Sequence, residues 1–406
     1  MKIGVISDLH LGYYPAFLSR VLGRELEQER LKQVFSVFAE EKVDTVAILG
    51  DLLHSWRGSG GWIQLMGFLN LIRRYRIPAF MVRGNHDILL PKVYDYIEEL
   101  SEGYLFTFFG LKSLEDRAPI SIEEEPHRGH AYTFLKDLHT VLPVAILPHA
   151  SSVMPSEDIH KVEENIWKLM MEQWDRKGIL FVHYFLRSRA GSIVSEITKR
   201  EPVVPDKRLV SGNVYIFAGH DHRPYRDESG KSHVIGSMFP RDARLGGSDV
   251  SFGIIEVQEN PPTVKYHPMT LKLPYHIEYR KIFNVAQEAK EWIENILEEK
   301  ELLSITELFI KDESFTLRTF YDYLASKGID IKRLQIMRIG RTSTKTGNDK
   351  NIVEIKDIAM LNITDAFRQY LNTHDLSLPK EIDKEELVKE TVDILSEIWK
   401  KGDENA

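Results

Sequence analysis

Short apolar runs alternate with longer amphipathic stretches along much of the chain. Three of the stretches repeat apolar residues at helical spacing, which predicts helices over Leu26–Glu41, Trp62–Tyr75 and Asp158–Arg176. The short runs predict buried strands, namely Lys2–Ser7, Val43–Leu49, Pro78–Val82, Val141–Leu147, Ile179–Val182 and Val214–Ala218. Strands and helices in this alternation predict an α/β domain whose helices cover a largely buried sheet.

The pattern then changes. Val234–Gly236, Val250–Val257 and Thr263–Pro268 are predicted strands without helices between them, which indicates a mixed sheet or two sheets packed face to face. A domain boundary is expected near Leu271–Tyr275. Beyond it a small α+β module is expected, with elements at Ile277–Phe283, Val285–Glu298, Ile305–Lys311, Leu317–Lys327 and Leu334–Ile339.

The last segments are a polar stretch and one amphipathic helix. Gly340–Asn351 (GRTSTKTGNDKN) predicts a loop, and the apolar residues of Ile382–Lys401 fall on one face of a helix. We therefore expect an α/β domain over 1–272, a capping α+β domain over 276–372 and a helical tail over 380–406.

Composition narrows the class of protein. A chain of 406 residues is long enough for two or three domains, and 43% apolar with 28% charged residues is typical of a soluble globular protein. No apolar run approaches the ~18 residues of a membrane span, and the opening residues indicate a buried strand rather than a signal peptide. The absence of cysteine excludes disulfides, thiolate catalysis and cysteine metal sites, and it fits a cytoplasmic location.

The net charge of −8 does not favour binding to DNA, because phosphate contacts need Lys and Arg. The charge is uneven, however, since residues 184–245 hold eleven basic side chains against seven acidic ones. The chain can therefore still present a local basic surface. Arg57, Arg187 and Arg189 are candidate phosphate contacts, with solvated surface as the alternative.

Polar motifs follow five of the predicted strands. They are Asp8-Leu9-His10, Gly50-Asp51, Gly84-Asn85-His86-Asp87, His183 and Gly219-His220-Asp221-His222. Because open α/β sheets bind ligands beyond the carboxyl ends of their strands, we expect these groups to meet in one place. Carboxylates, an amide oxygen and imidazoles without sulfur suit ions such as Mn²⁺, Fe²⁺ or Zn²⁺. Two ions ~3.5–4 Å apart can activate a water and clamp phosphoryl oxygens.

Each motif has a simpler structural explanation when it stands alone. Asp-x-His and Gly-Asp are commonly turns or helix caps, and Gly-Asn-His-Asp can form a turn with unusual backbone angles. Their occurrence together, each after an apolar run, favours a metal site. The histidines outside the motifs are expected to be surface or structural residues: His127, His130, His139, His149 and His160. His149 is the strongest exception, because it too follows a predicted strand.

The ordered motifs resemble the calcineurin-like metallophosphoesterase family, whose fold is a layered α/β sandwich. Within that family, Ser7-Asp8-Leu9-His10-Leu11-Gly12 and Gly50-Asp51-Leu52-Leu53-His54 are most similar to the SbcD-type nucleases of DNA double-strand-break repair. The resemblance covers about residues 1–240, and beyond Leu271 it is only architectural.

The resemblance implies two metal sites with one shared ligand. The implied ligands are Asp8, His10 and His222 for one ion, Asn85, His183 and His220 for the other, and Asp51 for both. Mn²⁺ is the first expectation for both ions, with Mg²⁺, Fe²⁺ or Zn²⁺ as alternatives.

The resemblance also implies roles for residues that bind no metal. His86 would stabilise the transition state and protonate the leaving oxygen, Asp87 would orient His86, and His54 would position DNA or the site. The implied activity is 3′→5′ trimming of duplex ends together with nicking of single strands. One departure is Met238–Asp249 (MFPRDARLGGSD), where the family usually has an acidic-then-basic segment, and this leaves the local DNA contacts open.

The implied partners are DNA, a second copy of the chain and an SMC-like coiled-coil ATPase. In a cellular host such an enzyme would be associated with the nucleoid. The tail helix over 380–401 is the candidate docking element for the ATPase, and packing on its own domain is the alternative.

Two other functions fit the same motifs. The first is a small-molecule phosphodiesterase or phosphatase of the same superfamily, against which stand His54 and the long segment after the boundary. The second is a scaffold that keeps the fold without catalysis, against which stands the complete set of motif residues.

Overall fold

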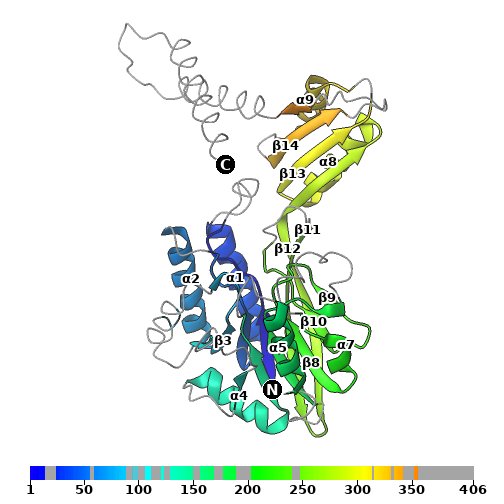
Figure 1. Cartoon of the computed structure of the whole chain (residues 1–406). Helices are drawn as coiled ribbons and strands as arrows, with labels where there is room; N and C mark the ends of the chain where they lie inside the picture. The colour runs from blue at the N-terminus through cyan, green and yellow to red at the C-terminus, as the bar shows by residue number, and fades with distance from the viewer. Residues whose placement is uncertain are drawn as a thin grey trace. The chain divides into compact units, whose positions relative to one another are not determined.

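Strand β12 (Pro262–Phe283) connects the two units of the chain, Met1–Ile277 and Glu278–Ala406. The fold is known from a computed structural model (Figure 1). The structure describes residues 1–13, 24–54, 59–87, 94, 97, 106–110, 120–122, 129–149, 156–168, 177–188, 203–239, 247–312, 315–330, 333–341 and 352–354.

One sheet of the first unit has the strand order β12-β11-β1-β2-β3-β4. Neighbouring strands from β1 to β4 are parallel, whereas β11 is antiparallel to both β1 and β12. β2 and β3 are buried at every position, as expected for parallel strands that are covered on both faces. The bounds are β1 (Lys2–Ile6), β2 (Thr45–Leu49), β3 (Ala79–Val82), β4 (Phe106–Phe109) and β11 (Gly247–Glu259).

The second sheet of this unit has the strand order β5-β6-β7-β8-β10-β9. Its four inner strands are parallel, and the two edge strands are antiparallel to their neighbours. The bounds are β5 (Ile120–Ser121), β6 (Val144–Leu147), β7 (Lys177–Val182), β8 (Asn213–Ala218), β9 (Tyr225–Arg226) and β10 (Ser232–Val234).

The two sheets share one apolar core. The rings of Phe80 in β3 and Phe181 in β7 lie 5.2 Å apart, and Phe217 in β8 stacks 5.9 Å from Phe181. Leu135 and Leu138 of helix α4 belong to the same core. The sequence prediction of a layered α/β sandwich is therefore confirmed, and both sheets are mixed.

Helices form the outer layers (Figure 1). On the first sheet, the ring of Phe38 in α1 lies directly against Gly4 of β1, where any larger side chain would collide with it. On the second sheet, Val162 of α5 and Leu209 of α7 pack into a separate apolar cluster. The helices are α1 (Arg24–Glu40), α2 (Ser59–Tyr75), α4 (His130–Val141), α5 (Ser156–Trp167) and α7 (Asp206–Val210).

Three details differ from the pattern in the sequence. Val141 ends helix α4, which was not predicted, so the strand expected from Val141 begins only at Val144. The intervening Pro143 explains the break, because the residue before a proline, Leu142, is extended (φ −150°). The strand expected over Val234–Gly236 ends at Val234, and β12 runs without interruption through Leu271–Tyr275.

The second unit is a small α+β module. β13 pairs with β14 in parallel, β15 is antiparallel to β14, and the helices pack Ile293 and Phe320 onto the sheet. Its elements are α8 (Ala286–Glu299), β13 (Leu302–Ile310), α9 (Leu317–Ser326), β14 (Leu334–Arg341) and β15 (Ile352–Glu354). The predicted tail helix over 380–401 lies outside the described residues. No described helix combines the length and the apolarity that a membrane span requires.

Candidate metal centre

The predicted site residues stand at the carboxyl ends of strands from both sheets. Asp8 follows β1, Asp51 follows β2 and Asn85 follows β3, while His183 and His220 follow β7 and β8. Since parallel strands end at the same edge of a sheet, this arrangement gathers the motifs in one place. The motifs do lie together, as the sequence predicted.

The backbone turns sharply at these strand ends. Asp8, His10, Asp51 and His220 all have positive φ, between 44° and 81°, which side chains other than glycine rarely adopt. Each such residue costs on the order of 1 kcal/mol or more, so the surrounding contacts must enforce it. Hydrogen bonds between the loops do so: Asp8 N donates to the Gly50 carbonyl (3.2 Å), and His10 N donates to the Asp51 carbonyl (2.8 Å).

Gly50 and Gly219 are required because atoms of neighbouring strand ends lie too close to them for a side chain. A Cβ on Gly50, which has φ +86°, would overlap the ring of His183. A Cβ on Gly219 would overlap the carbonyl oxygen of Leu49 and the side chain of Ser7. The pairs Gly-Asp and Gly-His therefore let two strand ends touch while the following residue reaches into the site.

Asp8, His10 and His222 form the first cluster of donor atoms. His222 Nε2 lies 3.2 Å from His10 Nε2 and 3.6 Å from Asp8 Oδ1. Asp8 Oδ2 accepts hydrogen bonds from Ser7 Oγ and His220 N, but the buried Asp8 Oδ1 has no hydrogen-bond donor among the described residues. A buried carboxylate oxygen without a donor is costly, and a cation at this point would satisfy it.

Asn85, His183 and His220 form the second cluster. Asn85 Oδ1 lies 3.1 Å from His183 Nε2 and 3.0 Å from His220 Nδ1. His183 Nδ1 lies 2.6 Å from the Leu49 carbonyl and must donate to it, which leaves the Nε2 lone pair directed at the cluster. Such a backbone bond is the usual way in which a protein fixes the tautomer of a metal-binding histidine.

Asp51 lies between the two clusters. Its Oδ2 is 3.6 Å from His10 Nε2 and 3.5 Å from His183 Nε2. Burial alone would raise the pKa of Asp51, but the charges of His183, His10 and His86 hold it well below its usual value. Asp51 is therefore a permanent carboxylate at the point where the two clusters meet. The donors here are oxygen and nitrogen atoms, which suit divalent ions of the Mn²⁺, Fe²⁺ and Zn²⁺ type. Asp8, His10 and His222 lie close enough together to hold such an ion, and so do Asp8, Asp51 and His183.

The same charge acts on His183. Burial lowers the pKa of His183, but the charge of Asp51 and their hydrogen bond raise it to about 9. The surroundings of this ring thus favour a positive charge at Nε2. A divalent ion would supply that charge in place of a proton, since metal binding requires a neutral imidazole.

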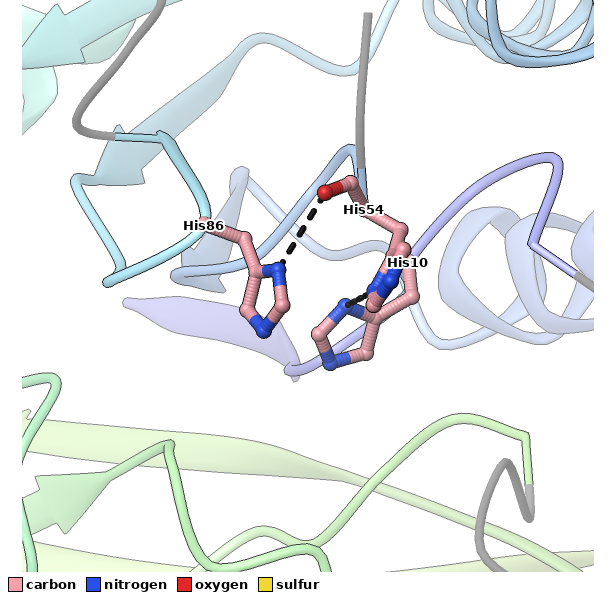
Figure 2. Close-up of side chains that lie close together, drawn as sticks. All are labelled: His10, His54 and His86. Carbon is pink, nitrogen blue, oxygen red and sulfur yellow. Dashed lines mark hydrogen bonds between the residues drawn. The ribbon is translucent and has the colours of Figure 1, made fainter. Parts of the chain in front are cut away.

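His86 is held at two points, one on its backbone and one on its ring. Its N–H donates to Asp51 Oδ1 (2.9 Å), and its Nδ1 lies 3.2 Å from the carbonyl oxygen of His54, to which it must donate. Figure 2 shows that the remaining ring nitrogen, Nε2, points to the same side as Nε2 of His10. His86 therefore offers Nε2 to whatever the metal centre holds.

His54 lies against both of these histidines. Its Nδ1 is 3.3 Å from His10 Nδ1, and its ring stacks on His86 with a centroid distance of 4.4 Å (Figure 2). Tyr13 stacks on His54 at 3.8 Å. The sequence analysis did not single out Tyr13, although the residue directly follows the first motif.

Asp87 has different partners from those expected. Its Oδ2 accepts hydrogen bonds from Asp51 N and Gly84 N, both at 2.8 Å, and its Oδ1 accepts one from the Tyr94 hydroxyl at 2.5 Å. The turn from Gly84 to Asp87 folds the carboxylate back on the backbone, so Asp87 forms no bond to the His86 ring within the described part of the chain. Burial and the nearby Asp51 raise the pKa of Asp87 to about 7.

Of the other candidates, His149 lies beside the site. It is fully buried, and its ring centroid is 5.3 Å from that of His220 and 5.9 Å from that of His183. Its carbonyl oxygen accepts a hydrogen bond from Arg83 Nε (2.9 Å), which ties β3 to the end of β6. Its place after a predicted strand had made His149 the exception among the histidines outside the motifs.

The predicted DNA contacts are only partly visible. Arg187 pairs with Glu163 at 2.5 Å and lines a pocket of about 500 Å³ together with Trp167 and Arg208. Arg57 and Arg189 lie outside the described residues, as does 240–246 of the segment that departs from the nuclease pattern.

A family model described as calcineurin-like phosphoesterase matches residues 1–224. Among curated proteins, the DNA double-strand break repair protein Mre11 of Archaeoglobus fulgidus is 26% identical over 235 residues, which is 55% of this chain and 46% of that protein. The chain thus spans about half the length of this relative.

Two solved structures are similar at low scores. A dimetal phosphatase from Danio rerio has a TM-score of 0.36 and 13% identity, covering 67% of this chain and 98% of its own. A nuclease from Pseudomonas putida has a TM-score of 0.25 and 14% identity, covering 66% of this chain and 87% of its own. Similarities at this level do not bear on the substrate.

Proposed function

The chain belongs to the calcineurin-like phosphoesterase family, and we propose that this metal-dependent hydrolase is a two-metal DNA phosphodiesterase. Its proposed activities are 3′→5′ trimming of duplex ends and nicking of single strands during double-strand-break processing. The observation that carries the proposal is the similarity to a DNA double-strand break repair protein over more than half of the chain. The position of His54 against His10 and His86 supports it, since this histidine belongs to the nuclease-like motif.

The proposed metal ligands are the two clusters and the carboxylate between them. One ion would be held by Asp8, His10 and His222, the other by Asn85, His183 and His220, and both by Asp51. Two bound ions, with Mn²⁺ as the first candidate, would supply positive charge that activates a water and neutralises the phosphoryl oxygens.

His86 is the proposed proton donor. Its Nδ1–H bond to the His54 carbonyl fixes the ring. In the imidazolium form, Nε2–H would pass its proton to the leaving oxygen as the P–O bond breaks, which leaves a neutral ring with its proton on Nδ1. Asp87 is proposed as a positioning residue for Asp51 rather than for His86, because it accepts the Asp51 backbone N–H. Such supporting carboxylates hold a ligand loop in one geometry.

Phosphate contacts are proposed for the basic side chains around β7 and α7. Arg187 lines the pocket described above with Lys207 and Arg208, and the Arg208 guanidinium lies 3.8 Å from the Trp167 ring. To bind a phosphate, Arg187 would have to give up its ion pair with Glu163. Ion pairs near the surface contribute only about 0–1 kcal/mol, so the cost of breaking this one is small. Arg57 and Arg189 are proposed contacts on sequence grounds alone.

Two protein partners are proposed, a second copy of the chain and an SMC-like ATPase. In a cellular host, the proposed binding to DNA would place the enzyme in the cytoplasm at the nucleoid. A second copy of the chain could cover the apolar residues Trp62, Ile63 and Met66 of α2, which are 40%, 51% and 49% exposed. An SMC-like coiled-coil ATPase is the proposed partner of the tail helix over 380–401.

A second candidate function is hydrolysis of small phosphodiesters or phosphomonoesters. The same donor clusters suit it, because they are specific for phosphoester chemistry and not for DNA. The decisive experiment measures Mn²⁺-dependent shortening of a linear duplex labelled at its 5′ ends, with bis(4-nitrophenyl) phosphate as a small ester in parallel. His86→Ser tests the site, and His267→Ser is the matched control because His267 is exposed on β12.

We expect wild type and His267→Ser to shorten the duplex from its 3′ ends. We expect His86→Ser to lose this activity while it still binds Mn²⁺. We expect the loss to be about 100-fold or more, as for other general acids. Hydrolysis of the small ester with DNA left intact, even when a coiled-coil ATPase is supplied, would replace the nuclease by the second candidate.

A further inference from the structure

A pocket of about 500 Å³ is lined by residues of helices α5 and α7 and of the segment that follows β7. Its charged lining consists of Glu163, Glu164, Arg187, Lys207 and Arg208. None of these residues belongs to the two proposed ligand clusters, so the pocket is separate from the metal centre. Sites for small molecules have volumes of ~300–1,000 Å³, and this pocket is therefore large enough for one nucleotide.

Two positive charges of this pocket are not neutralised by its carboxylates. Glu163 pairs with Arg187 (2.5 Å), and Glu164 pairs with a lysine four residues further along the chain (3.2 Å), so both carboxylates are already engaged. Neither Lys207 nor Arg208 forms an ion pair within the described part of the chain. Since both side chains are charged at pH 7, the pocket holds two cations that can neutralise an anionic ligand.

Arg208 is held in place before any ligand binds. Its guanidinium lies over the Trp167 ring, 3.8 Å from the ring centroid, in a cation–π contact. Such stacking leaves the N–H donors in the guanidinium plane available for a bidentate contact with an anion. Helix α7 is anchored as well, because Leu209 packs into an apolar cluster and the buried Asp206 accepts a hydrogen bond from Ser188 N (2.9 Å).

The pocket is close to the metal centre along the chain. Arg187 stands four residues after His183, and four residues of extended chain span at most ~14 Å. Phe185 lies between them, with its ring centroid 4.3 Å from that of His220. Because successive bases of a strand are ~3.4 Å apart, a strand bound at the metal centre can reach the pocket within about four nucleotides.

We propose that this pocket binds a phosphate monoester dianion, either at the end of a DNA strand or on a free nucleotide. A terminal phosphate carries a charge of about −1.5 to −2 at pH 7 and has three acceptor oxygens, whereas each phosphate inside a strand carries one charge. The two cations Lys207 and Arg208 match the dianion better, and the fork of Arg208 can bind two of its oxygens. Where the dianion ends a strand, the inference rests on the proposed DNA phosphodiesterase function and adds to it a site that anchors the strand end.

The alternative is that Lys207 and Arg208 are solvated surface cations that attract every phosphate alike. In that case a strand with a terminal phosphate would bind like a strand without one. A site for the dianion instead favours the phosphorylated strand, and the preference depends on these two side chains. Strands that differ only at their ends therefore separate the two roles.

The experiment measures the binding of single-stranded hexanucleotides by calorimetric titration. The strands carry a 5′-phosphate, a 3′-phosphate or no terminal phosphate, and deoxyadenosine monophosphate and deoxyadenosine are titrated separately. The full-length His86→Ser protein with Mn²⁺ is the background, so that bound DNA is not cleaved, and the salt concentration is constant because phosphate binding depends on it. Arg208→Gln and Lys207→Gln are added to this background. Arg280→Gln is the matched control, because the Arg280 guanidinium also lies near an aromatic ring (Phe309, 5.0 Å), but in the second unit.

We expect one of the two phosphorylated strands to bind about tenfold or more tightly than the unphosphorylated strand, the factor for one hydrogen bond to a charged group. Arg208→Gln and Lys207→Gln should each lose most of this preference, and Arg280→Gln should keep it. If the dianion comes from a free nucleotide, the strands will bind alike. Deoxyadenosine monophosphate will then bind more tightly than deoxyadenosine, and Arg208→Gln will abolish the difference.

Two results would overturn the pocket as a dianion site while DNA cleavage by wild type stands. One is the absence of any preference for a phosphate monoester, among the strands and between the two nucleosides. The other is a preference that Arg208→Gln and Lys207→Gln both leave unchanged. A wild-type enzyme that hydrolyses bis(4-nitrophenyl) phosphate but no DNA would instead remove the nuclease function and the strand end as the source. Binding of deoxyadenosine monophosphate that depends on Arg208 would still support the pocket in that case.

Discussion

Two buried histidines of the second sheet behave in opposite ways. His183 follows β7 and His233 lies in β10, with only β8 between these strands, and the two residues are 0% and 1% exposed. Burial lowers the pKa of both rings, because it disfavours the imidazolium form. The pKa of His183 is nevertheless raised to about 9, whereas that of His233 falls to about 4.

The difference comes from what each ring faces. His183 Nε2 lies 3.5 Å from Asp51 Oδ2. Burial is the largest single influence on the pKa of His183, but the charge of Asp51, their hydrogen bond and the charge of Asp8 together outweigh it. His233 packs on the rings of Phe217 (5.3 Å) and Tyr266 (4.5 Å), and its Nε2 donates to the Gly230 carbonyl (2.9 Å). Burial has the largest effect on the pKa of His233 and lowers it. The hydrogen bond to Gly230 raises this pKa, the charge of Arg226 lowers it and the charge of Asp227 raises it, and burial prevails. Burial alone therefore does not distinguish the two histidines, whereas a nearby buried carboxylate does.

The largest effect is expected when Asp51 is replaced. Asp51→Asn removes the carboxylate charge beside His183, and among the described residues His233 has no such buried charge beside it. Loss of the shared carboxylate should weaken both proposed ion sites. We expect hydrolysis of bis(4-nitrophenyl) phosphate to fall by more than about 100-fold, beyond the range for supporting residues of a metal site. Calorimetric titration with Mn²⁺ should show weaker binding at the same time.

Glu259→Gln is the control for Asp51→Asn, because Glu259 is an exposed carboxylate in β11. It should retain wild-type rate and Mn²⁺ binding. An Asp51→Asn protein that binds two ions as tightly as wild type would contradict the assignment of Asp51 as the shared ligand.

A smaller effect is expected from His233 as the pH falls. Its folded pKa of about 4 lies below the unfolded value of 6.5, so the unfolded chain binds the proton more readily between these values. The stability that this residue contributes is complete above pH 6.5 and is lost as the pH falls towards 4. By pH 5 the loss should reach about 2 kcal/mol in the free energy of unfolding.

Urea denaturation at pH 7 and pH 5 measures this loss. His233→Phe and His233→Gln cannot take up the proton, so each should lose about 2 kcal/mol less than wild type between the two pH values. His267→Gln serves as the control at an exposed histidine. Equal pH dependence in wild type and both His233 variants would show that this ring does not titrate in this range.

The clustering of the proposed ligands could be predicted from the sequence because each motif follows an apolar run that forms a parallel strand. Strand ends of that kind meet at one edge, so Asp8, Asp51 and His183 could be placed together without knowledge of their contacts. The partners of Asp87 could not be predicted, because they depend on how the turn from Gly84 folds back. The stacking of Tyr13 on His54 depends on the meeting of two separate loops, and no sequence pattern records it.

The fold was predicted best where burial is continuous. β2 and β3 are buried at every position and apolar at all of them except Thr45, so their runs were found to within a few residues. Helix α4 was missed although Ala131, Leu135 and Leu138 have helical spacing. The apolar run of the next strand continues back to Val141, which is the last residue of the helix. The continuity of β12 was missed because residues 267–272 in its middle are exposed or half-buried, so no continuous apolar run marks that part of the strand.

The smallest effect tests whether a carboxylate also distinguishes two buried tyrosines. The Tyr94 hydroxyl donates to Asp87 Oδ1 (2.5 Å), whereas the Tyr132 hydroxyl donates to the neutral Ile122 carbonyl (3.0 Å). Hydrogen bonds to charged acceptors contribute more than those to neutral ones, so Tyr94→Phe should cost about 1 kcal/mol more than Tyr132→Phe. Urea denaturation at pH 8 measures both, because Asp87, with its pKa raised to about 7, is then mainly ionised. Equal costs would mean that Asp87 keeps its proton at pH 8 and accepts the Tyr94 hydrogen bond as a neutral carboxyl group. A charged acceptor would then distinguish the two histidines but not the two tyrosines.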